Sequence, residues 1–190
     1  MCLGEITNGL VALGANLPSD VGDPPATIEM AFAALSEIAA GPLAQSKMYQ
    51  TPAFPAGSGP DYVNAAAAVP WRGTAETLLL ALHRIEAAAG RTRSARWEAR
   101  ILDLDLLSFG EAVLPDAKTE ETWRLLPPDA AMHATPDQLI LPHPRLSERG
   151  FVLVPLIEIA PDWRHPVTGL TVTAMHAMLS PEERAAIRPI

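Results

Sequence analysis

Apolar residues near the N-terminus change from the spacing of a strand to the spacing of a helix. A short apolar run at residues 9–15 predicts a strand, and a turn-rich stretch follows at residues 16–25. Over residues 27–40, apolar side chains recur every three or four positions, with prolines before the segment and a glycine directly after it. This spacing and these end signals predict a helix.

Two further strands and a second helix are expected between residues 44 and 89. Residues 44–51 and 62–71 have the pattern of strands, and the Pro-, Gly- and Ser-rich segment 52–60 between them is too long for a tight hairpin turn. Leucines and an isoleucine form an apolar stripe over residues 74–89, and a glycine follows at position 90. The loop between the two strands is free to line a binding site.

Fewer secondary-structure elements are predicted for the second half of the chain. Residues 101–109 have the period of a strand, whereas residues 114–139 contain four prolines and no sustained period, so we expect a long surface loop there that could serve as a lid. The apolar run at residues 151–157 predicts a strand, and residues 175–187 predict a short helix. The order of elements predicts an α+β fold, with helices on one face of a mainly antiparallel sheet.

Composition and charge narrow the classes of function. With 190 residues, the chain can bury one sizeable core, and we expect a single domain over residues 1–190. The net charge of −8 at pH 7 argues against a nucleic-acid or membrane-surface binder. The single cysteine, Cys2, excludes an internal disulfide framework and fits the cytoplasm, and no run approaches the roughly 20 apolar residues of a membrane span.

An Asp-x-Asp motif is the first candidate for chemistry. Because a strand places residues two apart on the same face, Asp103 and Asp105 are expected to project together. Paired carboxylates suit Mg²⁺, which takes its remaining ligands from water and from substrate phosphates. The alternative is a solvated strand face opposite the leucines at 102, 104 and 106, and the motif alone favours that alternative.

Arginines upstream of this motif favour a phosphate and metal site over a solvated strand face. Five arginines lie between positions 84 and 100, and guanidinium groups match phosphate oxygens in pairs of hydrogen bonds. Each arginine alone could instead neutralise a nearby carboxylate on the surface. Further along, His143 lies between two prolines and is followed by Arg145 and Arg149, so it could donate to a phosphate oxygen, although an isolated histidine is more often structural.

Four motifs, in order along the chain, resemble the 6-hydroxymethyl-7,8-dihydropterin pyrophosphokinase family. The resemblance runs from LGANL at residues 13–17 to PLIEIAPDW at residues 155–163, and its motifs are YQTPA at 49–53, DYVNAA at 61–66, RWEARILDLDLL at 96–107 and LPHPR…RGFVL at 141–153. It implies a ferredoxin-like α+β fold and Mg²⁺-dependent transfer of pyrophosphate from ATP to the hydroxymethyl group of the dihydropterin. The products would be AMP and the pterin pyrophosphate, in folate biosynthesis.

The resemblance also implies roles for individual residues. Two Mg²⁺ ions would bind Asp103 and Asp105, which with Arg91 and Arg100 form the catalytic set. The implied pterin contacts, with the ring between the tyrosine and the second phenylalanine, are Thr51, Phe54, Tyr62, Asn64 and Phe151. The implied nucleotide contacts are Glu86, Arg93, Trp97, His143 and Arg149.

The chain departs from the family pattern at two places, and two other functions are compatible with its motifs. Residues 114–139 form a longer connection than the family pattern has, and Ala99 stands where a proline commonly precedes the second catalytic-loop arginine. Another Mg²⁺-dependent enzyme of the same fold, such as a nucleotidyltransferase, would also place Asp-x-Asp on a strand. A family member that binds pterin or nucleotide without catalysis is the other alternative. The expected partners are ATP and the pterin, with no nucleic acid or membrane, and the expected state is a monomer.

Overall fold

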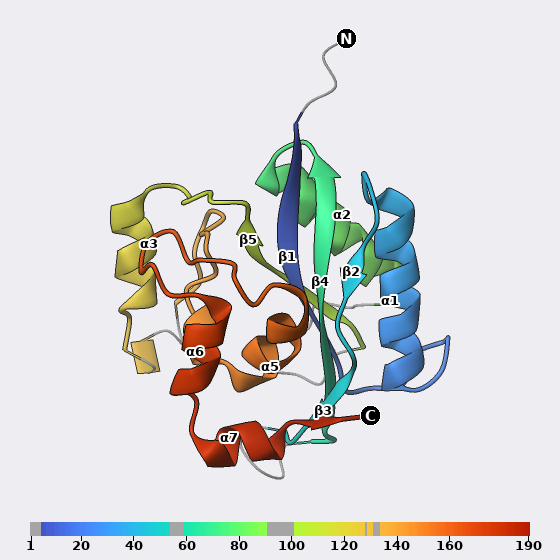
Figure 1. The fold of residues 1–190 in the computed structure, drawn as a ribbon. Helices are drawn as coiled ribbons and strands as arrows, with labels where there is room; N and C mark the ends of the chain where they lie inside the picture. The colour runs from blue at the N-terminus through green and yellow to red at the C-terminus, as the bar shows by residue number, and fades with distance from the viewer. Residues whose placement is uncertain (1–4, 54–58, 91–100, 128, 131–133) are drawn as a thin grey trace.

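β1 is flanked on both sides by antiparallel strands in a six-stranded sheet (Figure 1). The computed structural model describes residues 5–53, 59–90, 101–127, 129–130 and 134–190. The sheet order is β5-β1-β4-β3-β6, and β2 also pairs with β4. The strands are β1 (Ile6–Ala15), β2 (Ala44–Gln45), β3 (Tyr49–Thr51), β4 (Tyr62–Arg72), β5 (Asp103–Phe109) and β6 (Arg188–Pro189).

Two helices cover one face of this sheet. The Asp23 side chain caps α1 (Pro24–Ile38), and Thr74 forms a capping box with Thr77 at the start of α2 (Ala75–Ala88). Both helices bury apolar side chains against alternate residues of β1, β4 and β5. The order β1, α1, β3, β4, α2, β5 therefore confirms the ferredoxin-like α+β prediction.

The other face of the sheet is covered by α5 (Gly150–Ile159) and α6 (Val172–Met178), which form a second apolar cluster (Figure 1). The strand predicted at residues 151–157 is therefore wrong, as is the placement of helices on one face only. Val152, Leu153 and Leu156 are buried at helical spacing, but a short continuous apolar run has the same appearance in a helix and in a buried strand.

The segment 114–139 is not a loop throughout, because it contains α3 (Ala117–Arg124). The helix has almost no apolar stripe, so the sequence carried no helical period. It is fastened by polar contacts instead. Glu120 is fully buried, and its Oε1 lies 3.1 Å from Nε of Arg124 and 3.8 Å from Nε2 of His165.

The helix predicted at residues 175–187 is divided into two. α6 ends at Met178, and α7 (Pro181–Ala186) begins after Ser180, whose side chain accepts a hydrogen bond from the Glu183 amide. Because proline favours the first turn of a helix and breaks a helix interior, Pro181 starts a new helix instead of continuing the old one. A short 3-10 helix, η1 (Leu146–Glu148), precedes α5.

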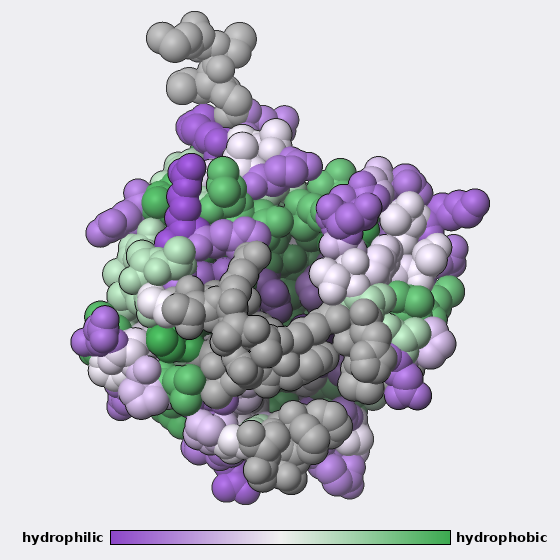
Figure 2. Space-filling model, turned by 180° about the vertical axis from the view of Figure 1, so that it is seen from behind, coloured by the Kyte–Doolittle hydropathy of each residue, from purple (hydrophilic) through white to green (hydrophobic). Residues whose placement is uncertain are grey.

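Two further observations concern the molecular surface and the length of the helices. On the side opposite to the view of Figure 1, hydrophilic as well as hydrophobic residues surround a hollow (Figure 2). Within the part of the chain that the structure describes, the helices are too short or too polar to cross a bilayer.

The buried histidine predicts how stability depends on pH. Burial, followed by the nearby Arg124 charge, lowers the pKa of His165 to about 4 from an ordinary value of 6.5. Between these two values the unfolded chain binds a proton that the folded chain does not, so the free energy of unfolding falls as pH falls from about 6.5 to about 4. We expect His165→Asn, which keeps an acceptor for the Val167 amide, to remove part of this slope, at most about 1.4 kcal/mol per pH unit.

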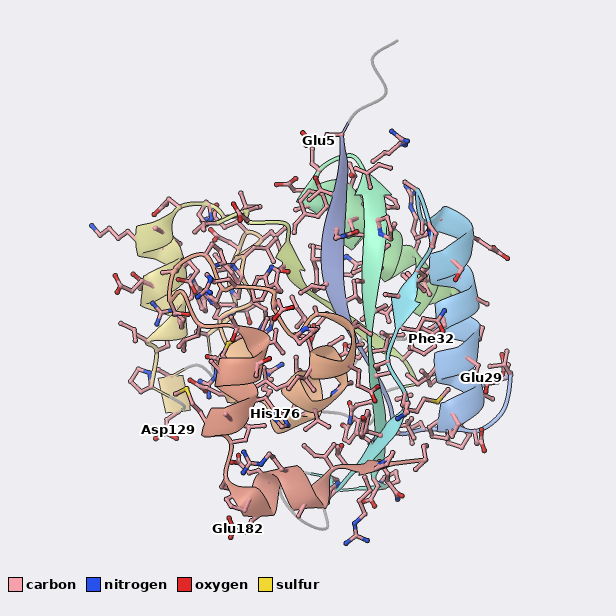
Figure 3. All side chains as sticks on the ribbon, viewed as in Figure 1. Glu5, Glu29, Phe32, Asp129, His176 and Glu182 are labelled. Carbon is pink, nitrogen blue, oxygen red and sulfur yellow. The ribbon has the colours of Figure 1, made fainter. Side chains whose placement is uncertain are left out.

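Urea unfolding at several pH values between 7 and 4 measures this slope. His176→Asn is the comparison variant. Burial also lowers the pKa of His176, but this residue of α6 is less buried (Figure 3), so His176→Asn should remove less of the slope than His165→Asn. His143, whose pKa is also lowered, keeps some slope in every variant. An unchanged slope in His165→Asn would contradict the conclusion that burial of neutral His165 contributes to the pH dependence of stability.

Candidate functional site

Three neighbouring strands place a carboxylate, a glycine and an amide in one row. Gly14 of β1 is paired with Asp103 of β5 on one side and with Asn64 of β4 on the other. Directly paired residues of antiparallel strands lie on the same face of the sheet. The row is therefore a continuous strip across the sheet, and we call Asp103, Gly14 and Asn64 the central row.

The two aspartates share this face, as predicted. Asp103 and Asp105 are partly exposed, whereas Leu104 and Leu106 are buried in the core on the α1 and α2 side. Nη1 of Arg149 lies 3.7 Å from Oδ2 of Asp105. The strand thus presents two carboxylates on one face with an arginine beside them.

His143 is held as a neutral hydrogen-bond donor near the aspartates. Burial, reinforced by the charge of Arg149 and opposed by that of Asp103, lowers the pKa of His143 to about 3. Its backbone amide donates to the Leu107 carbonyl at 2.8 Å, and its Nδ1 accepts from the Arg145 amide at 3.1 Å. Because Nδ1 is an acceptor, the proton is on Nε2, which can donate to a phosphate oxygen.

A second group of predicted residues gathers at the other end of the central row. Asn64 and Thr51 are buried, and Nδ2 of Asn64 donates to Oγ1 of Thr51 at 2.6 Å. Tyr62 is the paired neighbour of Thr51. The structure therefore brings three of the predicted pterin contacts together on β3 and β4.

The aromatic residue of α5 is joined to the aspartate side by an arginine. Phe151 lies in the first turn of α5 and is 39% exposed, so its ring is available to a ligand. The guanidinium carbon of Arg149 is 5.7 Å from the centre of this ring, within the range of a cation–π contact. Arg149 thus contacts both Asp105 and Phe151.

Glu86 was expected to contact the nucleotide, but its side chain is buried against β5. Its side chain on α2 is buried, with 2% of its surface exposed, and its Oε1 accepts a hydrogen bond from the backbone amide of Leu104 at 2.8 Å. Leu104 separates the two aspartates along β5. This contact positions the strand that carries the carboxylates, and the nucleotide contact of Glu86 stays a prediction.

Five predicted site residues cannot be placed. They lie outside the described residues, and they are Phe54, Arg91, Arg93, Trp97 and Arg100.

The carboxylate pair fits Mg²⁺ but not a metal that needs a complete set of protein ligands. Among the described residues, no three His, Cys, Asp or Glu side chains converge on one point. Mg²⁺ is commonly bound by one or two carboxylates, with substrate phosphates and water supplying the other oxygens. Asp103 and Asp105 provide that minimal donor set.

Sequence reasoning missed the residue that fastens α5 to the sheet. Oε2 of Glu158 accepts from the Lys47 amide at 2.7 Å, and its Oε1 lies 3.4 Å from Nζ of Lys47. Burial and a hydrogen bond to Glu158 raise the pKa of Tyr49 to about 12. Glu158 lies more than a hundred positions from Lys47 and Tyr49 in the sequence, so no local motif links it to them.

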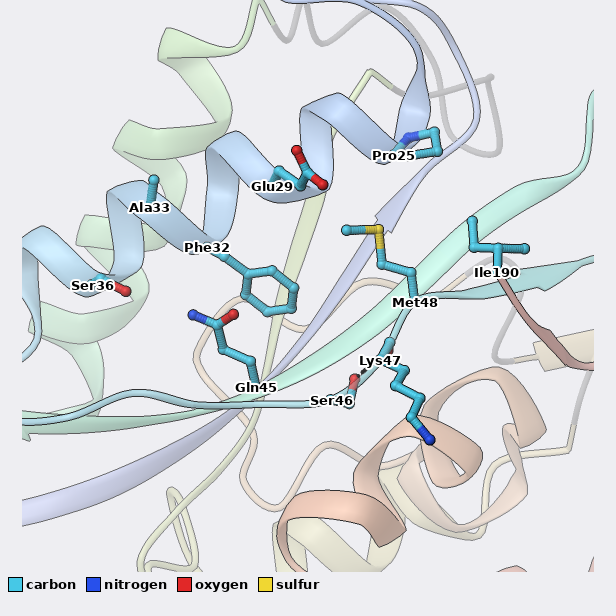
Figure 4. Close-up of a pocket in the computed structure, with 10 residues that line it drawn as sticks. All are labelled: Pro25, Glu29, Phe32, Ala33, Ser36, Gln45, Ser46, Lys47, Met48 and Ile190. Atoms are coloured by element: carbon cyan, nitrogen blue, oxygen red, sulfur yellow. Dashed lines mark hydrogen bonds between the residues drawn. The ribbon is translucent and has the colours of Figure 1, made fainter.

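A separate cavity of about 730 Å³ lies between α1 and residues 45–48, which lead from β2 to β3 (Figure 4). Phe32 points from α1 toward Gln45, and Ile190 lies at one end (Figure 4). None of the predicted site residues that the structure describes lines this cavity. The candidate site is therefore the strip around the central row.

Comparison with known proteins gives one consistent family. The sequence model of the 7,8-dihydro-6-hydroxymethylpterin-pyrophosphokinase family matches residues 10–161. The 2-amino-4-hydroxy-6-hydroxymethyldihydropteridine pyrophosphokinase of Methylorubrum extorquens is 34% identical over 180 residues, which cover 93% of this chain and 96% of that protein. The protein of the same name from Pseudomonas aeruginosa is 36% identical over 157 residues, with 82% of each chain covered.

Solved structures show the same fold. The wild-type HPPK-DHPS protein of Plasmodium falciparum superimposes with a TM-score of 0.61 and 13% sequence identity, covering 93% of this chain. This chain spans 45% of that longer one.

The Glu86 contact predicts a stability effect that a surface nucleotide contact would not have. Glu86→Ala leaves the buried Leu104 amide without this acceptor, so we expect the free energy of unfolding to fall by about 1–3 kcal/mol. Glu86→Gln keeps an oxygen that can accept the bond and should lose much less.

Urea unfolding of both variants measures the difference. Arg84→Ala, an exposed change on the same helix, is the control and should stay within about 0.5 kcal/mol of wild type. If Glu86→Ala were as stable as wild type, the strand-positioning role would be wrong.

Proposed function

The chain belongs to the 7,8-dihydro-6-hydroxymethylpterin-pyrophosphokinase family, and from this premise we propose that it transfers pyrophosphate from ATP to 6-hydroxymethyl-7,8-dihydropterin in folate biosynthesis. The observation that carries the proposal is the central row. It sets a carboxylate pair suited to metal-bound phosphates and a buried amide suited to a pterin at the two ends of one strip. Strands lie about 4.8 Å apart, so these ends are about 10 Å from one another.

The phosphate side of the strip is built on β5. Asp103 and Asp105 would hold two Mg²⁺ ions together with the triphosphate, and these ions supply neutralisation of phosphate charge when bound. The neutral His143 donates from Nε2 to a phosphate oxygen, and Arg149 adds a positive charge beside Asp105. Arg91 and Arg100 complete the phosphate contacts in this proposal, with Arg93, Trp97 and Glu86 on the nucleotide.

The pterin side is built on β3, β4 and α5. The ring stacks between Tyr62 and Phe151, because flat aromatic faces favour such packing. Asn64, with its Nδ2 already committed to Thr51, offers its amide oxygen to ring N–H groups. Phe54 covers the ring in the same proposal.

The reaction needs positioning more than acid–base chemistry. The hydroxymethyl oxygen attacks the β-phosphorus, the bond from that phosphorus to the oxygen bridging to the α-phosphate breaks, and AMP leaves with the bridging oxygen. The hydroxyl proton passes to solvent. Holding the two reactants in line and neutralising the phosphate charge accounts for most of the rate in such transfers.

Three further features belong to this proposal. The chain acts as a single domain over residues 1–190 and as a monomer, with ATP and the pterin as its partners and without nucleic acid or membrane. The single cysteine and the small polar substrates fit a cytoplasmic enzyme.

The products of the reaction test the proposal. Purified protein is mixed with ATP, Mg²⁺ and 6-hydroxymethyl-7,8-dihydropterin, and the nucleotides are separated by chromatography. We expect AMP in step with pterin pyrophosphate. ADP in place of AMP would mean that a single phosphoryl group is transferred, and binding of both ligands without products would support the non-catalytic alternative.

Removal of either carboxylate tests the metal assignment. We expect Asp103→Ala and Asp105→Ala to abolish transfer while leaving the thermal unfolding midpoint close to that of wild type, because both side chains are partly exposed. Asp162→Asn, an exposed change away from the strip, is the control and should keep full activity. Full activity with Mg²⁺ in either alanine variant would refute the assignment.

A further inference from the structure

We propose that Gly14 is a positioning residue for the pterin: its missing side chain leaves the space in which the Asn64 amide is held. The proposal rests on the proposed function, since it concerns how the pterin end of the central row is shaped. It gives this glycine near the C-terminal end of β1 a role in recognition and not in chain folding.

Backbone conformation does not explain this glycine. Glycine is needed where the chain takes a positive φ, as at Gly73 and Gly110. Gly14 lies within a regular strand, paired on both sides, and it is not among the glycines with positive φ. Glycine weakens a strand interior, so its presence here needs another reason.

That reason is found in the space above Gly14. A Cβ atom built on this residue would meet Oδ1 of Asn64 at 3.2 Å, and no other heavy atom of the described residues lies within 4 Å of it. Such a separation is tighter than an ordinary contact, so the neighbour must move by a few tenths of an ångström. The methyl group of an alanine would therefore act on one polar atom of the site.

Asn64 has little freedom to absorb this movement. Its side chain is 5% exposed, and the 2.6 Å hydrogen bond from Nδ2 to Thr51 holds the opposite end of the amide. A push on Oδ1 must stretch that bond or turn the amide plane. Either change misdirects the oxygen that faces the ligand. A misplacement of about 1 Å can cost about a hundredfold in rate, so a shift of a few tenths of an ångström should cost less.

Two other glycines that the structure describes, Gly9 and Gly41, have different environments. A Cβ at Gly9 would lie 2.3 Å from Cδ2 of Leu78, which is a core contact. A Cβ at Gly41 would lie 3.7 Å from Cβ of Pro70, which is ordinary packing. Gly41→Ala is therefore a matched control for exchanging a glycine where space is available.

The experiment compares wild type, Gly14→Ala and Gly41→Ala in the AMP-forming assay. We expect Gly14→Ala to lower kcat/KM for the pterin about 3- to 10-fold, with KM for ATP within about twofold of wild type. Its unfolding midpoint should not fall, because alanine suits a strand interior better than glycine. Gly41→Ala should match wild type in all three quantities.

A double-mutant cycle shows whether Gly14 acts through Asn64. Pterin affinity is measured by fluorescence titration for wild type, Gly14→Ala, Asn64→Ala and the double variant. If the methyl group acts on the amide, adding Gly14→Ala to Asn64→Ala costs no further affinity. An equal loss in both backgrounds would overturn the proposal.

Failure of this inference differs from failure of the proposed function. Wild-type protein that makes no AMP contradicts the function itself. Wild-type protein that makes AMP, together with a Gly14→Ala variant of unchanged kcat/KM for the pterin, contradicts the role of Gly14 alone.

Discussion

The register of β1 against its two neighbours is the constraint on which the candidate site depends. β1 is hydrogen-bonded along β4 on one side and β5 on the other, so its position fixes which residues of those strands face each other. A slip of β1 by one residue would turn Gly14 away from the face that carries Asp103 and Asn64. The apolar residues Val11 and Leu13 oppose such a slip, because they would leave the core under α1 and α2.

The helix on the functional face is held mainly by buried leucines and by Glu158 near its C-terminal end, while the partly exposed Arg149–Asp105 pair adds little stability. Near its start, Arg149 reaches Asp105, and near its end Glu158 binds the backbone and side chain of Lys47. Buried Leu153 and Leu156 fill the space between these ends. The contacts hold the turn that carries Phe151 over the same face as the central row, so the α5 packing and the proposed pterin stacking have one structural origin.

Much of this arrangement could be predicted from sequence, and the failures have physical causes. Period-two spacing predicted that Asp103 and Asp105 share a face, and apolar spacing with proline and glycine end signals predicted both helices of the first half. The continuous apolar run before Glu158 was misjudged as a strand because its length allows either structure. α3 was missed because buried Glu120 binds Arg124 and His165 without an apolar stripe. The importance of Gly14 depends on cross-strand pairing, which a single sequence does not specify.

The most direct test of this account is a crystal structure with Mg²⁺, a non-hydrolysable ATP analogue and the dihydropterin bound together. The account predicts phosphates at Asp103 and Asp105, the pterin edge at Asn64, and the hydroxymethyl oxygen at about 3–3.5 Å from the β-phosphorus. Binding of either ligand away from this strip, for example in the cavity beside α1, would contradict it.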